Sequence, residues 1–144
     1  MFADLIKRLT QPEPQQLPET DARLALTALL VRIARADNDY SPQERARIDS
    51  IIATRYGLEG ADRDALRRDA ESIEAEAPDT VRFTRAIKDA VPYDQRLGVV
   101  EALWQVALAD GSRAKEEDAL LRMVSNLLGV SDIDSAQARR RMES

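Results

Sequence analysis

A short acidic stretch occurs twice in this 144-residue chain, each time between two apolar runs with helical spacing. Asp110 follows Asp37, and Glu117 follows Glu44, by the same 73 residues. In both copies an apolar run ends in Ala-Asp, a polar turn follows, and the Glu stands at the start of the next run. This pattern predicts two helix–acidic turn–helix units related by duplication, with the rest of the chain packed around them.

The composition indicates one globular all-α domain. Apolar residues make up 44% of the chain and charged residues 33%, which is typical of a folded protein and not of a disordered acidic tail. Aromatic residues are only 4%, which favours close packing of helix on helix over a sheet. A chain of this length buries a single core. We expect a single-domain helical bundle of about seven helices, built on the two duplicated units.

The longest apolar runs predict two central helices. Each run is apolar around most of the helix circumference, as a buried helix must be. In the duplicated frame, Trp104 occupies the place of Val31. Each partner helix ends at a glycine, Gly57 or Gly129, which can supply a left-handed cap. The apolar positions of the two central runs are Leu24, Ala25, Ala28, Leu29, Val31, Ile33 and Ala36, and Leu97, Val99, Val100, Leu103, Trp104, Val106, Ala107 and Leu108.

We place the domain boundary after residue 18. Residues 1–18 are expected to form an amphipathic helix and a proline-rich connector, and residues 19–144 the helical domain. Thr20 or Asp21 can cap the first long helix. The apolar face of the N-terminal helix comprises Phe2, Leu5, Ile6 and Leu9.

Three further helices are expected outside the two units. Residues 61–77 predict an exposed, highly charged helix, and residues 81–90 a short one. Pro92 is expected to open the second long helix. After Gly129 a weak terminal helix is expected to decay at Arg139.

Charge and residue types exclude several classes of function. The net charge of −5 and the scattered arginines exclude nucleic acid as the main partner. The chain has no cysteine and no histidine, so thiolate or histidine-dependent catalysis and zinc–thiolate sites are impossible. We therefore expect no enzyme. No apolar run is long enough to span a membrane and no signal pattern is evident, so we expect a cytoplasmic protein.

Helix capping and metal binding are both open for the acidic turns. Ser41 and Glu44 match a capping box, with Pro42 at the first helical position. Asp37 and Asp110 stand at the unfavourable negative end of a helix. They can bond backbone N–H groups of the turn, point toward the start of the next helix, or bind a metal. Without cysteine or histidine, the metal would be a hard divalent cation, calcium or magnesium.

The first turn begins like a calcium-binding EF-hand loop and then departs from it. Side-chain oxygens fall at positions one, three, five and eight, on Asp37, Asp39, Ser41 and Glu44. An EF-hand needs glycine at position six and glutamate at twelve, where this chain has Pro42 and Ile48. The EF-hand is therefore excluded. If the two units pack about a pseudo-twofold axis, four carboxylates would converge on one shared metal site, and these are Asp37, Glu44, Asp110 and Glu117.

At these residues the chain resembles the tellurite-resistance TerB family. That family has a hydrophobic helix ending in Ala-Asp-Gly, a turn and a helix-opening Glu in both halves of an all-helical domain. The matching stretches are residues 33–37 with 41–44, and residues 103–111 with 116–117, followed by the Leu-Gly at 128–129. Asn38 replaces the first glycine of the pattern. The resemblance covers roughly residues 21–131.

The resemblance implies a non-enzymatic module linked to stress response or tellurite resistance. It implies protein partners, membrane-associated ones among them, and a suspected divalent cation at Asp37, Glu44, Asp110 and Glu117. The alternative is a protein–protein interaction scaffold with purely structural acidic turns, tethered by its N-terminal helix. A metal-dependent hydrolase is a distant third, since no base, nucleophile or phosphate cradle accompanies the carboxylates.

Overall fold

The computed structural model describes residues 19–36, 40–76, 80–109 and 115–143, with the backbone alone at 19–21, 82, 83, 86, 90 and 115–117. Within these ranges the chain forms seven α-helices, one 3-10 turn and no strand, which confirms the all-α prediction. The elements are α2 (Glu19–Ala34), α3 (Pro42–Tyr56), α4 (Gly60–Glu76), α5 (Thr80–Ala90), η1 (Tyr93–Gln95), α6 (Arg96–Ala107), α7 (Lys115–Leu127) and α8 (Asp132–Glu143).

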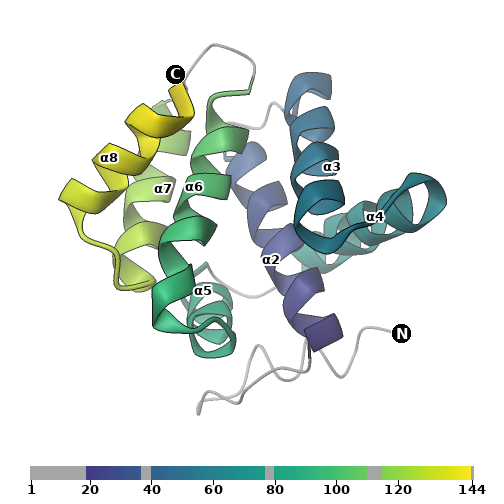
Figure 1. The fold of residues 1–144 in the computed structure, drawn as a ribbon, viewed down its shortest axis with the longest axis horizontal. Helices are drawn as coiled ribbons and strands as arrows, with labels where there is room; N and C mark the ends of the chain where they lie inside the picture. The colour runs from purple at the N-terminus through teal and green to yellow at the C-terminus, as the bar shows by residue number, and fades with distance from the viewer. Residues whose placement is uncertain (1–18, 37–39, 77–79, 110–114, 144) are drawn as a thin grey trace.

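The two predicted central helices, α2 and α6, lie side by side in the middle of the bundle (Figure 1). α2 packs against α3, α4, α5, α6 and α7, and α6 packs against α2, α3, α7 and α8. Leu29, Ile33 and Leu103 are fully buried, and each contributes about 1.5–3 kcal/mol by leaving water. The nearly all-round apolar character of both helices is therefore explained by neighbours on several sides.

The two units match at the helix ends that flank each acidic turn and in several helix–helix contacts. α2 ends at Ala34 and α6 at Ala107, and α3 begins at Pro42 and α7 at Lys115, so both boundaries repeat after 73 residues. The contacts α2–α3, α2–α4 and α3–α6 have the counterparts α6–α7, α6–α8 and α2–α7. The C-terminal ends of α2 and α6 and the N-terminal ends of α3 and α7 lie at the same end of the bundle, at the top of Figure 1. The origin of the units by duplication stays a prediction.

Local capping signals are confirmed. Ser41 and Glu44 form the capping box at the start of α3. Gly57 ends α3 with φ of 66°, and Gly129 follows α7 with φ of 82°, both in the left-handed region that glycine tolerates best. After α7, the N–H of Val130 donates to the carbonyl of Ser125 at 2.9 Å.

Three predicted helix ends are wrong. α2 begins at Glu19, so Thr20 and Asp21 lie inside its first turn and do not precede it. The residues after Pro92 form the 3-10 turn η1, and α6 starts at Arg96. The terminal helix does not decay at Arg139 but continues to Glu143, because α8 packs along α6.

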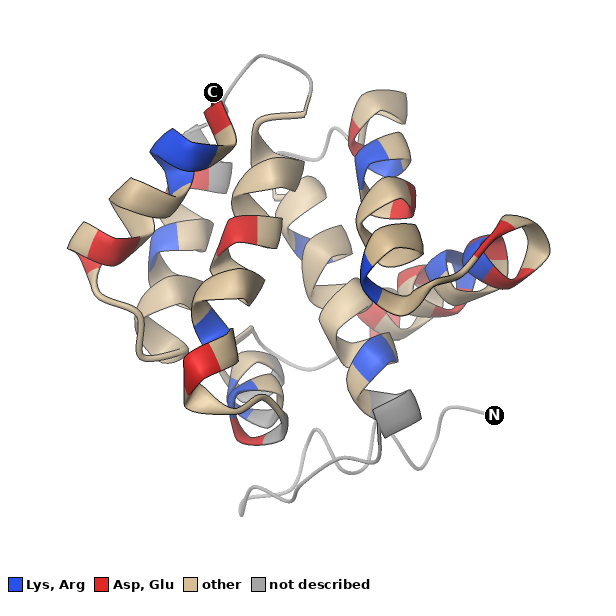
Figure 2. Ribbon diagram, in the orientation of Figure 1, with Lys and Arg blue, Asp and Glu red and all other residues tan. Residues whose placement is uncertain are grey.

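The charged helix predicted at 61–77 is α4, and Figure 2 shows acidic and basic residues alternating along it. Ala70 and Ile73 are its buried residues and face the core, since α4 packs against α2 and α3. The predicted N-terminal helix with Phe2, Leu5, Ile6 and Leu9 and its proline connector lie outside the described residues. None of the described helices combines the length and apolarity needed to cross a lipid bilayer.

Candidate functional site

The first junction, between α2 and α3, contains the one predicted site side chain that the structure describes. Glu44 lies in the first turn of α3 and is 1% exposed. The backbone of Glu117 lies in the first turn of α7, and its side chain is outside the described part of the chain. Asp37 and Asp110 are also outside the described residues. The convergence of the four carboxylates therefore stays a prediction.

Only one of the two carboxylate oxygens of Glu44 is used by the helix cap. Oε1 accepts a hydrogen bond from the backbone N–H of Ser41 at 3.0 Å, and the Ser41 hydroxyl accepts one from the N–H of Glu44 at 3.1 Å. Oε2 is buried and has no hydrogen-bond partner within the described part of the chain. Buried polar atoms are normally satisfied, so an orphan oxygen calls for a further partner such as a water or an ion.

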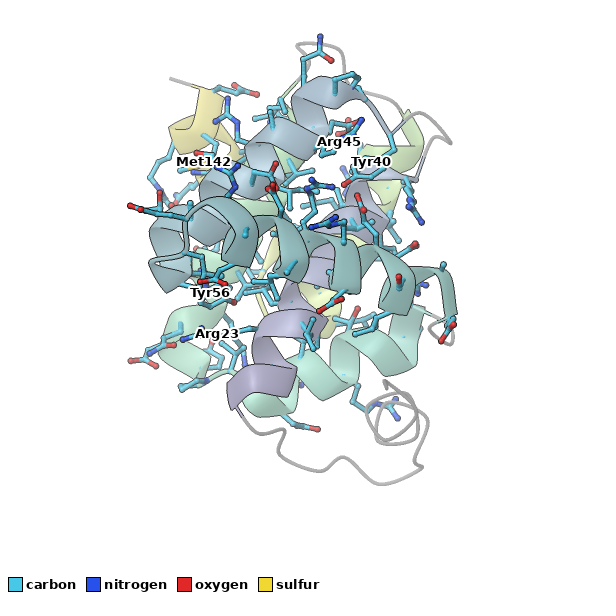
Figure 3. The ribbon with its side chains drawn as sticks, turned by 90° about the vertical axis from the view of Figure 1, so that its right-hand side faces the viewer. Arg23, Tyr40, Arg45, Tyr56 and Met142 are labelled. Atoms are coloured by element: carbon cyan, nitrogen blue, oxygen red, sulfur yellow. The ribbon has the colours of Figure 1, made fainter. Side chains whose placement is uncertain are left out.

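Tyr40 ties the first junction to α4. Its hydroxyl donates to Glu71 Oε2 at 2.7 Å. The guanidinium carbons of Arg35 and Arg45 lie 5.3 and 5.9 Å from the centre of its ring, and Figure 3 shows Arg45 beside Tyr40. Burial raises the pKa of Tyr40, and the hydrogen bond and negative charge of Glu71 raise this pKa further. The junction is therefore anchored on its α4 side by a protonated phenol.

Glu71 and Glu74, the carboxylates of α4 nearest the first junction along the helix, are paired with arginines. Arg67 Nε lies 2.8 Å from Asp49 Oδ1 on α3, and Arg67 Nη1 lies 3.3 Å from Glu71 Oε2. Glu74 receives Arg32 of α2, with 3.3 Å between Nε and Oε1. Among the described side chains, no group of three or more acidic residues is arranged to hold a metal ion. A cation at the first junction would therefore depend on Glu44 and the predicted turn residues, not on α4.

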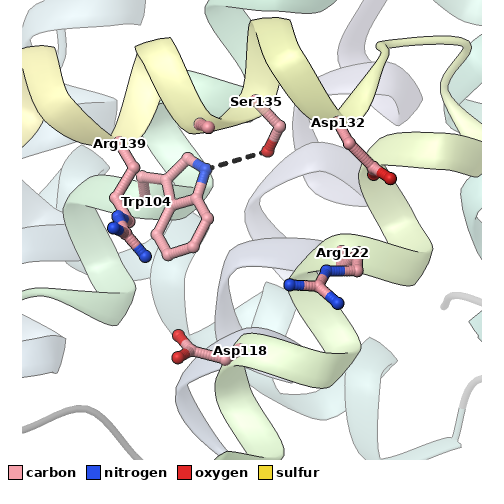
Figure 4. A pocket seen from close by; sticks show the side chains of 7 residues that line it. Trp104, Asp118, Arg122, Asp132, Ser135 and Arg139 are labelled. Atoms are coloured by element: carbon pink, nitrogen blue, oxygen red, sulfur yellow. Dashed lines mark hydrogen bonds between the residues drawn. The ribbon is translucent and has the colours of Figure 1, made fainter.

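A second candidate site is a cavity of about 300 Å³ between α6, α7 and α8, called here the α6–α7–α8 cavity (Figure 4). Trp104 forms one wall and donates its indole N–H to Ser135 Oγ at 3.1 Å. The guanidinium carbon of Arg139 lies 5.7 Å from the centre of the indole. The lining side chains are Trp104, Asp118, Arg122, Asp132, Ser135 and Arg139, together with Ala136.

Sequence reasoning missed this cavity. Its walls come from three helices whose residues are up to 35 positions apart, from Trp104 to Arg139, and no local spacing brings them together. The one available signal was Trp104 itself, which stands where the first unit has Val31. Both are largely buried, at 6% and 0% exposed, so a large ring stands in the second unit where the first has a small side chain.

Comparisons with known proteins agree with the sequence pattern. The family model described as tellurite resistance protein TerB matches residues 23–140. A search of curated proteins finds no match. The crystal structure of a protein of unknown function from Porphyromonas gingivalis W83 is similar in fold, with a TM-score of 0.61 and 19% identity over 94% of this chain and 96% of that one. Because the family model spans most of the chain, the protein belongs to the tellurite resistance protein TerB family.

Proposed function

We propose that this chain is a non-catalytic, cytoplasmic TerB module that holds one divalent cation, calcium or magnesium, at its two helix junctions. The observation that carries the proposal is Oε2 of Glu44. This carboxylate oxygen is buried beside the first junction and has no hydrogen-bond partner among the described residues. Leaving such an oxygen unsatisfied costs about 1–3 kcal/mol, and more when it is charged.

A hard cation suits this chain because the available ligands are all oxygens. Calcium and magnesium prefer carboxylate and carbonyl oxygens, and the chain has neither cysteine nor histidine to favour a softer metal. Oε1 of Glu44 is held by the cap at the start of α3, which fixes the orientation of the carboxylate group. Glu44 is thus a pre-oriented ligand with one oxygen available, and Asp37 is its predicted partner in the first unit.

The match between the units supports a single shared site. Glu117 takes the place of Glu44 at the start of α7, and Asp110 takes the place of Asp37 after α6. The helix ends that flank both junctions lie at the same end of the bundle (Figure 1). One cation between the junctions would neutralise part of the charge of four carboxylates that otherwise repel one another.

Thermal unfolding of the metal-stripped full chain tests this proposal. Millimolar calcium, magnesium or manganese should raise the melting temperature, because binding to the folded state adds about 2.7 kcal/mol at a hundredfold excess over Kd. The rise should disappear in Asp37→Ala and in Asp110→Ala. Asp62→Ala is the matched control, since it removes an exposed carboxylate from the first turn of α4. An equal rise in all variants would contradict the assigned site.

An interaction scaffold is the second candidate, and one face of α7 favours it. Ala119, Met123 and Leu127 are spaced four residues apart and line a shallow depression with Asn126. Met123 is 39% exposed, which is high for a large apolar side chain. In this case the N-terminal helix tethers the module, and deletion of residues 1–18 or Met123→Asp should release a co-purifying protein. The metal-dependent rise in melting temperature should be absent even from the wild-type chain.

A further inference from the structure

A comparison of the two matched units reveals a missing carboxylate in the second. In the first unit, α4 is attached to α3 by a compact ionic group. Arg67 lies between Asp49 on α3, at 2.8 Å, and Glu71 one turn along α4, at 3.3 Å. The side chains of all three are mostly buried, so the arginine is paired on both sides.

α8 carries counterparts of Arg67 and Glu71, the two α4 residues of this ionic group. Gly57 and Gly129, the left-handed glycines after α3 and α7, are 72 residues apart, as are the first residues of α4 and α8. By this register Arg139 takes the place of Arg67. Its partner one turn along α8 is Glu143, with 3.2 Å between Arg139 Nε and Glu143 Oε1. The intrahelical pair is therefore retained.

On α7, the counterpart of Asp49 has the opposite charge. α3 and α7 begin 73 residues apart, and Ile48 and Leu121, both fully buried, are also 73 residues apart. The residue that follows Leu121 is Arg122, so an arginine stands where the first unit has Asp49. No carboxylate of the described residues forms an ion pair with Arg122. The second unit thus has an arginine on each side of the α7–α8 contact, and α7 lacks the acid that α3 has at Asp49.

The α6–α7–α8 cavity lies at this position. Figure 4 shows the side chains of Arg122 and Arg139 on opposite sides of the cavity, with Trp104 between α6 and α8 forming the adjacent wall. Its volume of about 300 Å³ falls at the lower end of the range of small-molecule sites. Arg139 keeps its ion pair with Glu143, whereas Arg122 forms no ion pair with a carboxylate of the described residues.

We propose that the α6–α7–α8 cavity binds a small aromatic carboxylate. The carboxylate of the ligand occupies the role that Asp49 has in the first unit and pairs with Arg122 and Arg139. Planar guanidinium groups bind carboxylates with paired, charge-assisted hydrogen bonds. The aromatic body of the ligand packs on the indole of Trp104, for which offset or edge-on ring contacts are favourable. This site is independent of the cation proposed at the helix junctions.

The two acidic residues of the cavity do not replace the missing carboxylate. Asp118 already has an interaction partner, and its Oδ1 is buried without a hydrogen-bond partner among the described residues. Asp132 is exposed in the first turn of α8, where the positive end of the helix dipole favours its charge. Neither forms an ion pair with Arg122 in the described part of the chain. The anionic ligand therefore has an unpaired cation to bind.

The single tryptophan of the chain reports directly on this cavity. The test follows the indole N–H resonance of Trp104 in the ¹⁵N-labelled full chain during titration with phenylacetate. Phenylacetamide and phenethylammonium are matched neutral and cationic probes. We expect saturable shifts with phenylacetate and affinity lower by roughly tenfold or more for the other two probes, because they cannot form the charge-assisted bonds. Equal or tighter binding of phenethylammonium, or no shift with any probe, would overturn the proposal.

Two variants of one arginine separate a binding role from a folding role. Arg122→Gln removes the exposed guanidinium and should abolish the phenylacetate shift while the helical circular dichroism stays unchanged. Arg122→Asp rebuilds the pair of the first unit with Arg139, so it should also abolish binding without loss of stability. Arg140→Gln, at an exposed position of α8 outside the cavity, should bind like the wild type. Wild-type affinity in Arg122→Gln would show that the carboxylate does not bind here.

Discussion

Trp104 donates its indole N–H to Ser135 Oγ across 3.1 Å and so joins α6 to α8. The Ser135 hydroxyl lies 3.4 Å from that of Ser125 on α7, and Ser125 donates to the carbonyl of Leu121 at 2.8 Å. A buried polar chain thus crosses three helices of the second unit. In the first unit, α4 is joined to α3 and to α2 by the ion pairs of Arg67 with Asp49 and of Arg32 with Glu74.

Removal of the Ser135 hydroxyl should destabilise the fold. Ser135→Ala leaves the buried indole N–H of Trp104 without its acceptor, at a cost of about 1–3 kcal/mol in the free energy of unfolding. Ser125 keeps its bond to the Leu121 carbonyl, so the loss is confined to Trp104. Urea unfolding followed by circular dichroism measures the change. Ser50→Ala, at an exposed position on α3, is the control and should change the value by less than about 0.5 kcal/mol.

Loss of the Asp49 carboxylate should be more costly than loss of a surface acid. Asp49→Ala leaves Arg67, whose side chain is only 14% exposed, without its partner on α3. We expect a decrease of about 1–3 kcal/mol in the free energy of unfolding. Asp64 pairs with Arg63 at a more exposed site, so Asp64→Ala should cost less than about 1 kcal/mol. Equal decreases in the free energy of unfolding of Asp49→Ala and Asp64→Ala, measured by urea titration, would show that the α3–α4 ion pair stabilises the fold no more than the surface pair does.

The cap of α3 gives a third prediction. Ser41→Ala removes the hydroxyl that accepts from the N–H of Glu44, and should lower the free energy of unfolding by about 1 kcal/mol. Gln43→Ala changes an exposed side chain in the same turn and should have little effect. The urea midpoints of the two variants and the wild type, compared at constant m-value, check both expectations. A Ser41→Ala variant as stable as Gln43→Ala would mean that the capping bond does not hold the helix start.

Tyr40 should make stability depend on alkaline pH. Burial and Glu71 raise its pKa in the folded state, whereas an unfolded tyrosine ionises near pH 10. The folded state therefore keeps its proton where the unfolded state loses it. The stabilising contribution is complete below about pH 10 and is lost as pH rises above that value.

The test for Tyr40 is urea unfolding between pH 8 and pH 11 on the wild type and Tyr40→Phe. The variant lacks the ionisable hydroxyl, so its free energy of unfolding should decline less steeply above pH 10. It also loses the hydrogen bond to Glu71 and should be less stable at pH 8. Parallel declines in both proteins would contradict the raised pKa of the tyrosine.

Features set by neighbours in the sequence were predictable, and features set by tertiary pairing were not. The capping box at Ser41 and the glycine ends at Gly57 and Gly129 depend on a few adjacent residues, and the structure confirms them. The central position of α2 and α6 followed from their all-round apolar surface. The ion pair of Arg67 with Asp49 joins two helices and has no local spacing signal, so the sequence did not indicate how α4 is attached to α3.

The candidate sites also contain some features that the local sequence predicts and others that depend on tertiary packing. The capping role of Glu44 was visible in the sequence, but the burial of its second oxygen depends on the packing around α3. The α6–α7–α8 cavity is lined by side chains from three helices, which no local spacing in the sequence brings together. The positions of Asp37 and Asp110, outside the described residues, stay predictions from the duplicated pattern.

The most direct test of the proposed function is the number of cations that the metal-stripped full chain binds, measured by equilibrium dialysis against calcium and magnesium. A shared site at the two junctions predicts one ion per chain, and loss of that ion in both Asp37→Ala and Asp110→Ala. Two ions per chain, each lost in only one variant, would show separate sites. No bound ion at millimolar concentration, or one ion retained in both variants, would contradict a cation site at the helix junctions.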